Sequence, residues 1–175
     1  MSIGTTYLQS VILRLETNKK LGTTTITRLD AAQLHWQPDG TSNSIAHIIK
    51  HLHGNMLSRW TDFLTTDGEK SGRHRDLEFE NDQLTKEQLL ELWETGWQCM
   101  LSAIGSLEEA DLEKTVYVRS EAHSVIDAIN RQLAHVPYHI GQIVYVGKMI
   151  LQGNWESLSI PKGQSEAFNK AKTGR

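Results

Sequence analysis

Hydrophobic residues recur three or four positions apart in four long stretches of this chain, the spacing that places side chains on one face of a helix. These stretches predict helices over residues 6–21, with an extension as far as 29, and over residues 44–64, 85–104 and 124–151. The alternating pattern of a strand is nearly absent, and only residues 115–118 suit a short extended segment. The pattern therefore predicts an all-α fold in which helix packs on helix.

Residues that favour helix starts support three of these boundaries. Asn43 or Ser44 can accept a hydrogen bond from the free backbone N–H groups at the start of the second helix. Thr85, with Gln88 three residues later, forms a capping box at the start of the third helix, and Ser124 opens the fourth in a similar way. Capping residues and hydrophobic periodicity therefore agree on where three of the four helices begin.

The segments between and after the helices are polar. A long charged loop, residues 65–79, separates the second and third helices. Such a run is the usual composition of a solvated surface, but its charged side chains also suit recognition of an anionic substrate. We expect a single domain over residues 1–175, with a core of about 5–152 and a tail over 153–175. Three large side chains of the tail offer docking points on the core: Trp155, Ile160 and Phe168.

The composition is that of an ordinary globular protein. The chain has 175 residues, a net charge of -3 with histidine neutral, and one cysteine, Cys99. This length suffices to bury a core without disulfides, and an unpaired cysteine favours a reducing compartment. No basic excess suggests nucleic acid, no leader pattern opens the chain, and no apolar run approaches the length of a membrane span. We therefore expect a cytoplasmic protein without nucleic-acid or membrane partners.

Two of the eight histidines, His135 and His139, stand four residues apart in the fourth predicted helix. Side chains at this spacing share a helix face, with Cβ atoms about 5–6 Å apart, so two imidazoles can reach one ion. Hydrophobic neighbours predict a buried setting, in which unpaired imidazoles are costly and a shared ion removes the cost. Pro137 between them either shapes the site by a kink or is a tolerated bend. Gln142 suits either a hydrogen-bond partner of a metal-bound histidine or a core amide.

A second cluster, His47, His51 and His53, lies in the second predicted helix. His47 and His51 share a face, whereas His53 is rotated by about 200° from His51 and cannot serve the same site. Geometry therefore leaves two candidates, His47 or His51, for a third ligand beside the pair on the fourth helix. Three imidazoles with one or two open coordination positions are the pattern of a catalytic zinc site rather than a structural one.

Two segments taken together resemble the DinB/YfiT-like superfamily: residues 44–52, SIAHIIKHL, and residues 135–143, HVPYHIGQI. The stretches HLHGNMLSRW at 51–60 and FLTTDGEK at 63–70 are similar to one branch of that superfamily, whose function is uncharacterised. The likeness runs from the first predicted helix to about residue 152. It implies a DinB-like four-helix bundle with a metal held by one histidine of the second helix and an HxxxH motif of the last long helix.

Carried over residue by residue, the resemblance implies that the metal ligands are His51, His135 and His139. The choice of His51 over His47 comes from the resemblance, because the apolar residues before His51 have the spacing that precedes the ligand in the superfamily. Pro137 departs from the commoner filling of the HxxxH motif, which affects the ring geometry rather than the assignment.

The resemblance also implies a divalent-metal-dependent enzyme, with zinc or nickel as the expected ion. Characterised members use low-molecular-weight thiols, so a thiol S-transferase is the leading hypothesis. The alternatives are a hydrolase that uses metal-bound water, a non-catalytic metal-binding or stress-response module, and three core histidines without a metal. The sequence assigns no catalytic residue. Because such bundles often pair and five tryptophans exceed what a small core needs, we also expect a homodimer.

Overall fold

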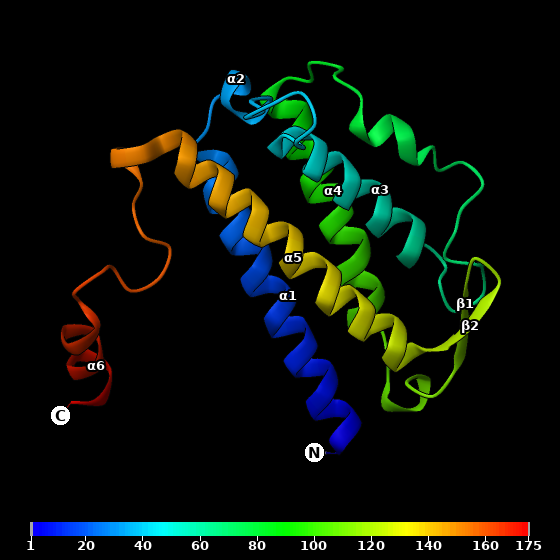
Figure 1. Ribbon diagram of the computed structural model, residues 1–175. Coiled ribbons are helices and arrows are strands. Elements are labelled where there is room, and N and C mark those ends of the chain that lie inside the picture. Colours follow the sequence, from blue (N-terminus) through cyan, green and yellow to red (C-terminus); the bar gives the residue numbers. More distant parts are fainter. Residues whose placement is uncertain (1, 175) are drawn as a thin grey trace.

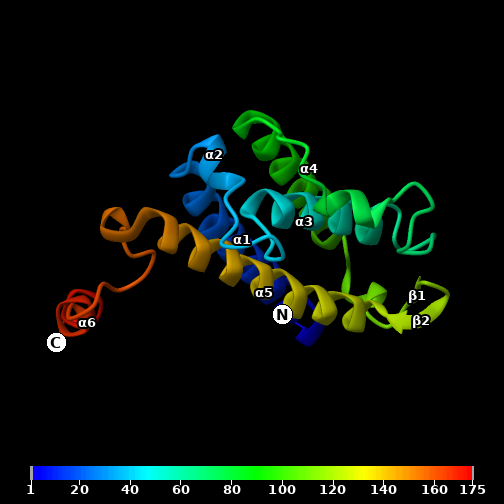
Figure 2. The same ribbon diagram turned by 45° about the horizontal axis from the view of Figure 1, so that its top comes forward.

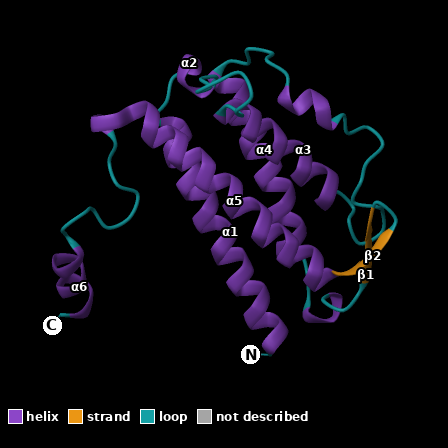
Figure 3. Cartoon of the chain, viewed as in Figure 1, coloured by secondary structure: helices purple, strands orange, loops and turns teal. Residues whose placement is uncertain are grey.

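The computed structural model describes residues 2–174, and helices dominate them (Figure 1). The α-helices are α1 (Ile3–Thr27), α2 (Ala31–Leu34), α3 (Ile45–Trp60), α4 (Lys86–Gly105), α5 (Val125–Leu151) and α6 (Ser165–Thr173). Three short 3-10 helices are η1 (Arg75–Phe79), η2 (Glu109–Asp111) and η3 (Gln152–Asn154). The strands β1 (Thr115–Val118) and β2 (Glu121–Ser124) form an antiparallel hairpin, drawn in orange in Figure 3. The expectation of a mainly helical chain is confirmed, with this small sheet added.

The four long helices pack around a common hydrophobic core. Helix α3 contacts α4 and α5, and α1 contacts the same two helices from the other side. Figures 1 and 2 show α1 beside α5 and α3 beside α4. Trp93 and Trp97 of α4 are fully buried, with ring centroids 5.4 Å apart in an edge-on arrangement that suits the quadrupoles of two aromatic rings. This packing fixes α3 and α5 relative to each other, and these two helices carry the histidines.

The helix starts expected from capping residues are confirmed. The hydroxyls of Ser44, Thr85 and Ser124 each accept a hydrogen bond from a backbone N–H in the first turn of α3, α4 and α5. Helix α3 ends at Trp60, four residues before the expected end, because Thr61 is extended and Asp62 has a positive φ of 48°. Helix ends thus depend on backbone turns that hydrophobic periodicity does not register.

The β1–β2 hairpin is held by the charged loop of residues 65–79. The turn residues Arg119 and Ser120 have φ values of 54° and 64°, a conformation that usually requires glycine or asparagine. Asp67 accepts hydrogen bonds from both turn N–H groups, at 2.9 and 2.7 Å, and Gly68 N–H donates to the carbonyl of Tyr117 at 2.7 Å. Part of the charged loop is therefore a structural brace for the hairpin.

Helix α5 runs through Pro137 and continues to Leu151. The proline removes one backbone N–H, which costs α5 one intrahelical hydrogen bond without ending it. In the tail, Trp155 is half-buried and lies under the guanidinium of Arg28, whereas Ile160 and Phe168 are 37% and 39% exposed. Of the three expected docking residues, Trp155 is the most buried, and it contacts Arg28 at the end of α1. None of the helices within residues 2–174 combines the length and apolar character needed to cross a bilayer.

Candidate metal centre

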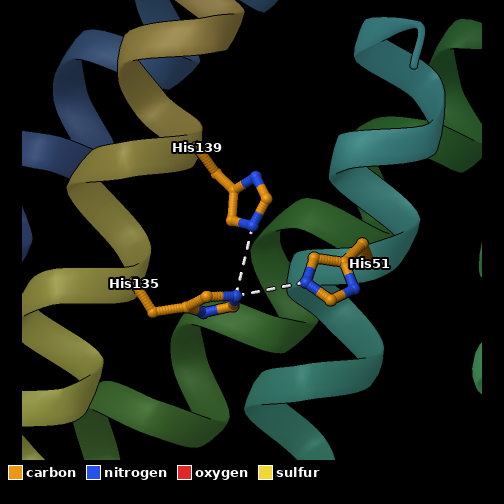
Figure 4. A group of neighbouring side chains, drawn as sticks. All are labelled: His51, His135 and His139. Atoms are coloured by element: carbon orange, nitrogen blue, oxygen red, sulfur yellow. Dashed lines mark hydrogen bonds between the residues drawn. The ribbon is translucent and has the colours of Figure 1, made fainter. Parts of the chain in front are cut away.

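Three histidine side chains from two helices meet between α3 and α5. His51 Nε2 lies 3.2 Å from His135 Nε2, and His139 Nε2 lies 3.1 Å from the same atom (Figure 4). All three potential ligand atoms lie within 4.8 Å of one another. The structure thus brings together the three histidines that the resemblance implied as ligands.

His47, the other geometric candidate, has a different role. Its ring Nδ1 accepts a hydrogen bond from the backbone N–H of Ser44, and the backbone N–H of His47 donates to the Ser44 hydroxyl. This reciprocal capping box starts α3. His53 also points elsewhere, since its Nδ1 bonds the carbonyl of Leu92 on α4. Of the second cluster, only His51 joins the pair on α5.

The outer nitrogens of two rings are held by oxygen acceptors. His51 Nδ1 lies 2.9 Å from Glu78 Oε2, and His139 Nδ1 lies 2.8 Å from Gln142 Oε1. A carboxylate or amide oxygen accepts but does not donate, so each Nδ1 must carry the proton. In a neutral imidazole the opposite nitrogen, Nε2, then presents a lone pair. Both lone pairs are directed at His135 Nε2.

Protons alone satisfy this arrangement poorly. His135 Nε2 carries at most one hydrogen, yet two lone pairs approach it at hydrogen-bond distance. Its Nδ1 is buried and has no hydrogen-bond partner among residues 2–174. A cation placed between the three Nε2 atoms resolves the crowding, because every ring then points a lone pair at positive charge.

The surroundings favour the neutral form of the two rings on α5, His135 and His139. Burial, reinforced by the neighbouring histidines, lowers the pKa of His135 to about 4. Burial also lowers the pKa of His139, although the Gln142 hydrogen bond opposes part of that shift. A neutral ring is the protonation state that binds a metal.

Glu78 is the contributor that the sequence did not reveal. Burial would raise its pKa, but hydrogen bonds from His51 and Arg73, with the charge of Arg73, more than offset this and hold the pKa below its usual range. Arg73 grips the carboxylate with two nitrogens, at 2.7 and 3.0 Å. A carboxylate on the outer nitrogen of a histidine fixes its tautomer and orientation, the arrangement common around protein-bound metals.

Close approach of Glu78 to α3 depends on Gly54. A Cβ at position 54 would overlap the Glu78 carboxylate, so only glycine leaves room for it. Lys50, beside His51 on α3, donates to the carbonyl of Glu80 at 2.5 Å and ties down the same segment. These contacts position η1 over the histidines. A glycine three residues after a candidate ligand was the only sequence signal of this approach.

The donor set fits a four-coordinate divalent ion with an open position. Zinc–nitrogen bonds of about 2.0–2.1 Å in tetrahedral geometry separate the nitrogens by roughly 3.3–3.4 Å, close to the two short separations observed, and the third pair, His51 and His139, lies within 4.8 Å. The loop carboxylates Asp67 and Glu69 do not complete the coordination shell, because they pair with the hairpin turn and with Arg59. Within residues 2–174 the ligand cluster consists of the three histidines alone.

Comparison with family models gives one match, over residues 2–164, to a family described as protein of unknown function DUF1572. The chain belongs to that family. The matched region of this DUF1572 protein includes the three histidines, Glu78 and the hairpin, and it stops just before α6. Searches of curated proteins and of solved structures give no match.

Proposed function

We propose that this DUF1572 protein is a DinB/YfiT-type metal-dependent enzyme, a four-helix bundle whose His51, His135 and His139 bind zinc or nickel. The proposal rests mainly on one observation, the convergence of three Nε2 atoms of which two have their protons held on the opposite nitrogen. The sequence resemblance to that superfamily points to the same three residues.

A divalent ion held by three neutral ligands keeps its full charge and lowers the pKa of a thiol or water that binds at its open position. The chain's own residues prepare this site. Glu78 and Gln142 hold two ring tautomers, and Arg73 holds Glu78. The partly buried setting around the rings limits competition from bulk water.

The reaction that we propose is transfer of a low-molecular-weight thiol to an electrophile. Zinc and nickel accept soft sulfur ligands readily, and within residues 2–174 the site offers no cysteine sulfur because Cys99 lies near Thr61 and the carbonyl of Met56 instead. An external thiol therefore suits the open position.

Titration of cobalt-loaded protein with several small thiols tests this proposal. We expect an intense near-ultraviolet charge-transfer band with at least one thiol, followed by turnover when an electrophile is added. A control with His135→Ala protein should show no band. If no thiol produces the band in cobalt-loaded wild-type protein, thiol transfer is excluded, and hydrolysis by metal-activated water or a non-catalytic metal-binding role becomes the better account.

A further inference from the structure

A partly open cavity of about 180 Å³ adjoins the histidine cluster, between α3, α5 and strand β1. The hairpin lies beside the C-terminal end of α3 and the N-terminal end of α5, so it forms one wall (Figure 1). His135 lines the cavity, and its imidazole therefore belongs to both the cavity and the metal centre. The volume is below the roughly 300–1,000 Å³ of clefts that hold drug-sized ligands, so a small molecule is the fitting occupant.

Polar atoms without partners concentrate in residues that line this cavity. Seven buried side-chain polar atoms lack a hydrogen-bond partner among residues 2–174, and four of them belong to residues that line it. Asn55, Trp60 and Gln132 are only 9%, 3% and 5% exposed, and His135 is the fourth. Each of these atoms is closed off from solvent and so lies behind the cavity surface, and a side-chain rotation that turns it into the cavity would let a ligand supply the partner it lacks.

The chemistry of the four atoms specifies that ligand. Trp60 Nε1 and Gln132 Nε2 are donors, and His135 Nδ1 becomes a donor when its Nε2 faces the metal. Asn55 Oδ1 is an acceptor and needs a donor on the ligand. A ligand that reaches these four atoms needs acceptor oxygens for the donors and one hydroxyl or amino group for Asn55.

The charges at the cavity favour an anion. Arg59 and Arg131 line it, and its lining within the described part of the chain contains no aspartate or glutamate. Arg59 is partly neutralised by Glu69 at 3.1 Å, whereas the nearest polar contact of Arg131 is His123 Nε2 at 3.0 Å. Guanidinium groups suit carboxylates because their planar donors match both oxygens.

From these observations we infer that the cavity binds a small hydroxy- or amino-carboxylate, with its carboxylate on the Arg131 side and its hydroxyl or amino group on Asn55. This inference rests on the proposed function in one respect, since it makes the carboxylate part of the substrate that reacts at the metal. The binding itself needs only cavity residues that do not depend on the metal, namely Asn55, Trp60, Gln132 and the arginines.

Isothermal titration of metal-free protein tests the inference, with lactate and serine as probes and lactamide as a neutral control of the same size. We expect saturable binding of at least one carboxylate and none of lactamide. Arg131→Gln should weaken binding about tenfold or more, as loss of a charge-assisted hydrogen bond predicts. Arg14→Gln, an exposed arginine on α1, removes the same charge away from the cavity and should leave binding unchanged. Ligand-induced change in tryptophan emission should disappear in Trp60→Phe.

The outcomes separate this inference from the proposed function. Absence of carboxylate binding by folded protein that still takes up cobalt overturns the inference and leaves the metal proposal intact. Binding of phosphate or chloride without either carboxylate also overturns it, in favour of an inorganic anion. Carboxylate binding that Arg131→Gln weakens, in protein that fails to take up cobalt, supports the cavity and refutes the metal-dependent function.

Discussion

Replacing Glu78 with glutamine should weaken metal binding while leaving all three histidines in place. Glu78 Oε2 accepts from His51 Nδ1 at 2.9 Å, and Arg73 holds the carboxylate with two contacts of 2.7 and 3.0 Å. Glutamine keeps the shape of the side chain but removes its charge and weakens its two hydrogen bonds with Arg73. Loss of such a partner typically costs 10–100-fold in metal affinity, or about 1.4–2.7 kcal/mol.

The affinity is best measured by competition between the protein and a chromophoric chelator for cobalt or zinc. Asp76→Asn is the matched control, because Asp76 is exposed on the same short helix η1 and loses the same charge. The control should bind metal as the wild type does. Equal affinities of the Glu78→Gln and Asp76→Asn proteins would refute the view that Glu78 orients His51.

Gly54→Ala should disturb the same hydrogen bond between Glu78 and His51. The new methyl group would occupy the position of the Glu78 carboxylate and force it away from His51. We expect metal affinity to fall in the same direction as in Glu78→Gln. Combining the two changes should then add little, because both remove one interaction. Fully additive losses would show that Gly54 acts through some other contact.

Three further predictions concern His47 and His51 of α3, the pH dependence of stability and the oligomeric state. His51→Ala should abolish tight cobalt binding. His47→Ala should keep cobalt binding and lose only about 1 kcal/mol of folding stability, because only a capping hydrogen bond is removed. The reverse result would make His47, not His51, the metal ligand. Metal-free protein should be most stable above about pH 6.5 and should lose stability as the pH falls toward 4. The reason is that buried histidines take up protons less readily than they do in the unfolded chain. A melting temperature that does not drop between pH 7.5 and 5 would contradict this prediction. The histidines with burial-lowered pKa values are His47, His53, His135 and His139. The protein should form a homodimer through the exposed Tyr138 and Tyr145 of α5. Light scattering should give twice the chain mass for the wild type and a lower mass for Tyr145→Lys. A wild-type monomer at micromolar concentration would refute the dimer.

The tryptophans that first suggested a dimer are largely explained by one chain. Trp60, Trp93 and Trp97 are each 3% exposed or less and belong to the hydrophobic core. Trp155 is half-buried against Arg28. The homodimer prediction therefore rests on the two exposed tyrosines of α5 rather than on the number of tryptophans.

Local signals predicted the helices well because their causes are local. Ser44, Thr85 and Ser124 cap helices within three residues of themselves, so the sequence alone placed those starts. The face shared by His135 and His139 likewise follows from their four-residue spacing within one helix. Such features need no knowledge of which helices pack together.

The remaining features depend on contacts between distant segments. Glu78 meets His51 across 27 residues, and the only local sign of the pairing is Gly54, three residues after His51. The turn at Arg119 and Ser120 lacks the glycine or asparagine that usually marks it, because Asp67, about 50 residues earlier, stabilises it instead. Such contacts between distant segments can be identified only once the fold is known.

Metal content of protein purified without a histidine tag tests the central claim most directly. After incubation with zinc or nickel and removal of excess ion, elemental analysis of the wild type should give roughly one ion per chain, as a single three-histidine site requires. A variant with His51, His135 and His139 all changed to alanine should retain none while staying helical by circular dichroism. A wild type that holds no ion, or a folded triple variant that holds as much as the wild type, would contradict the account.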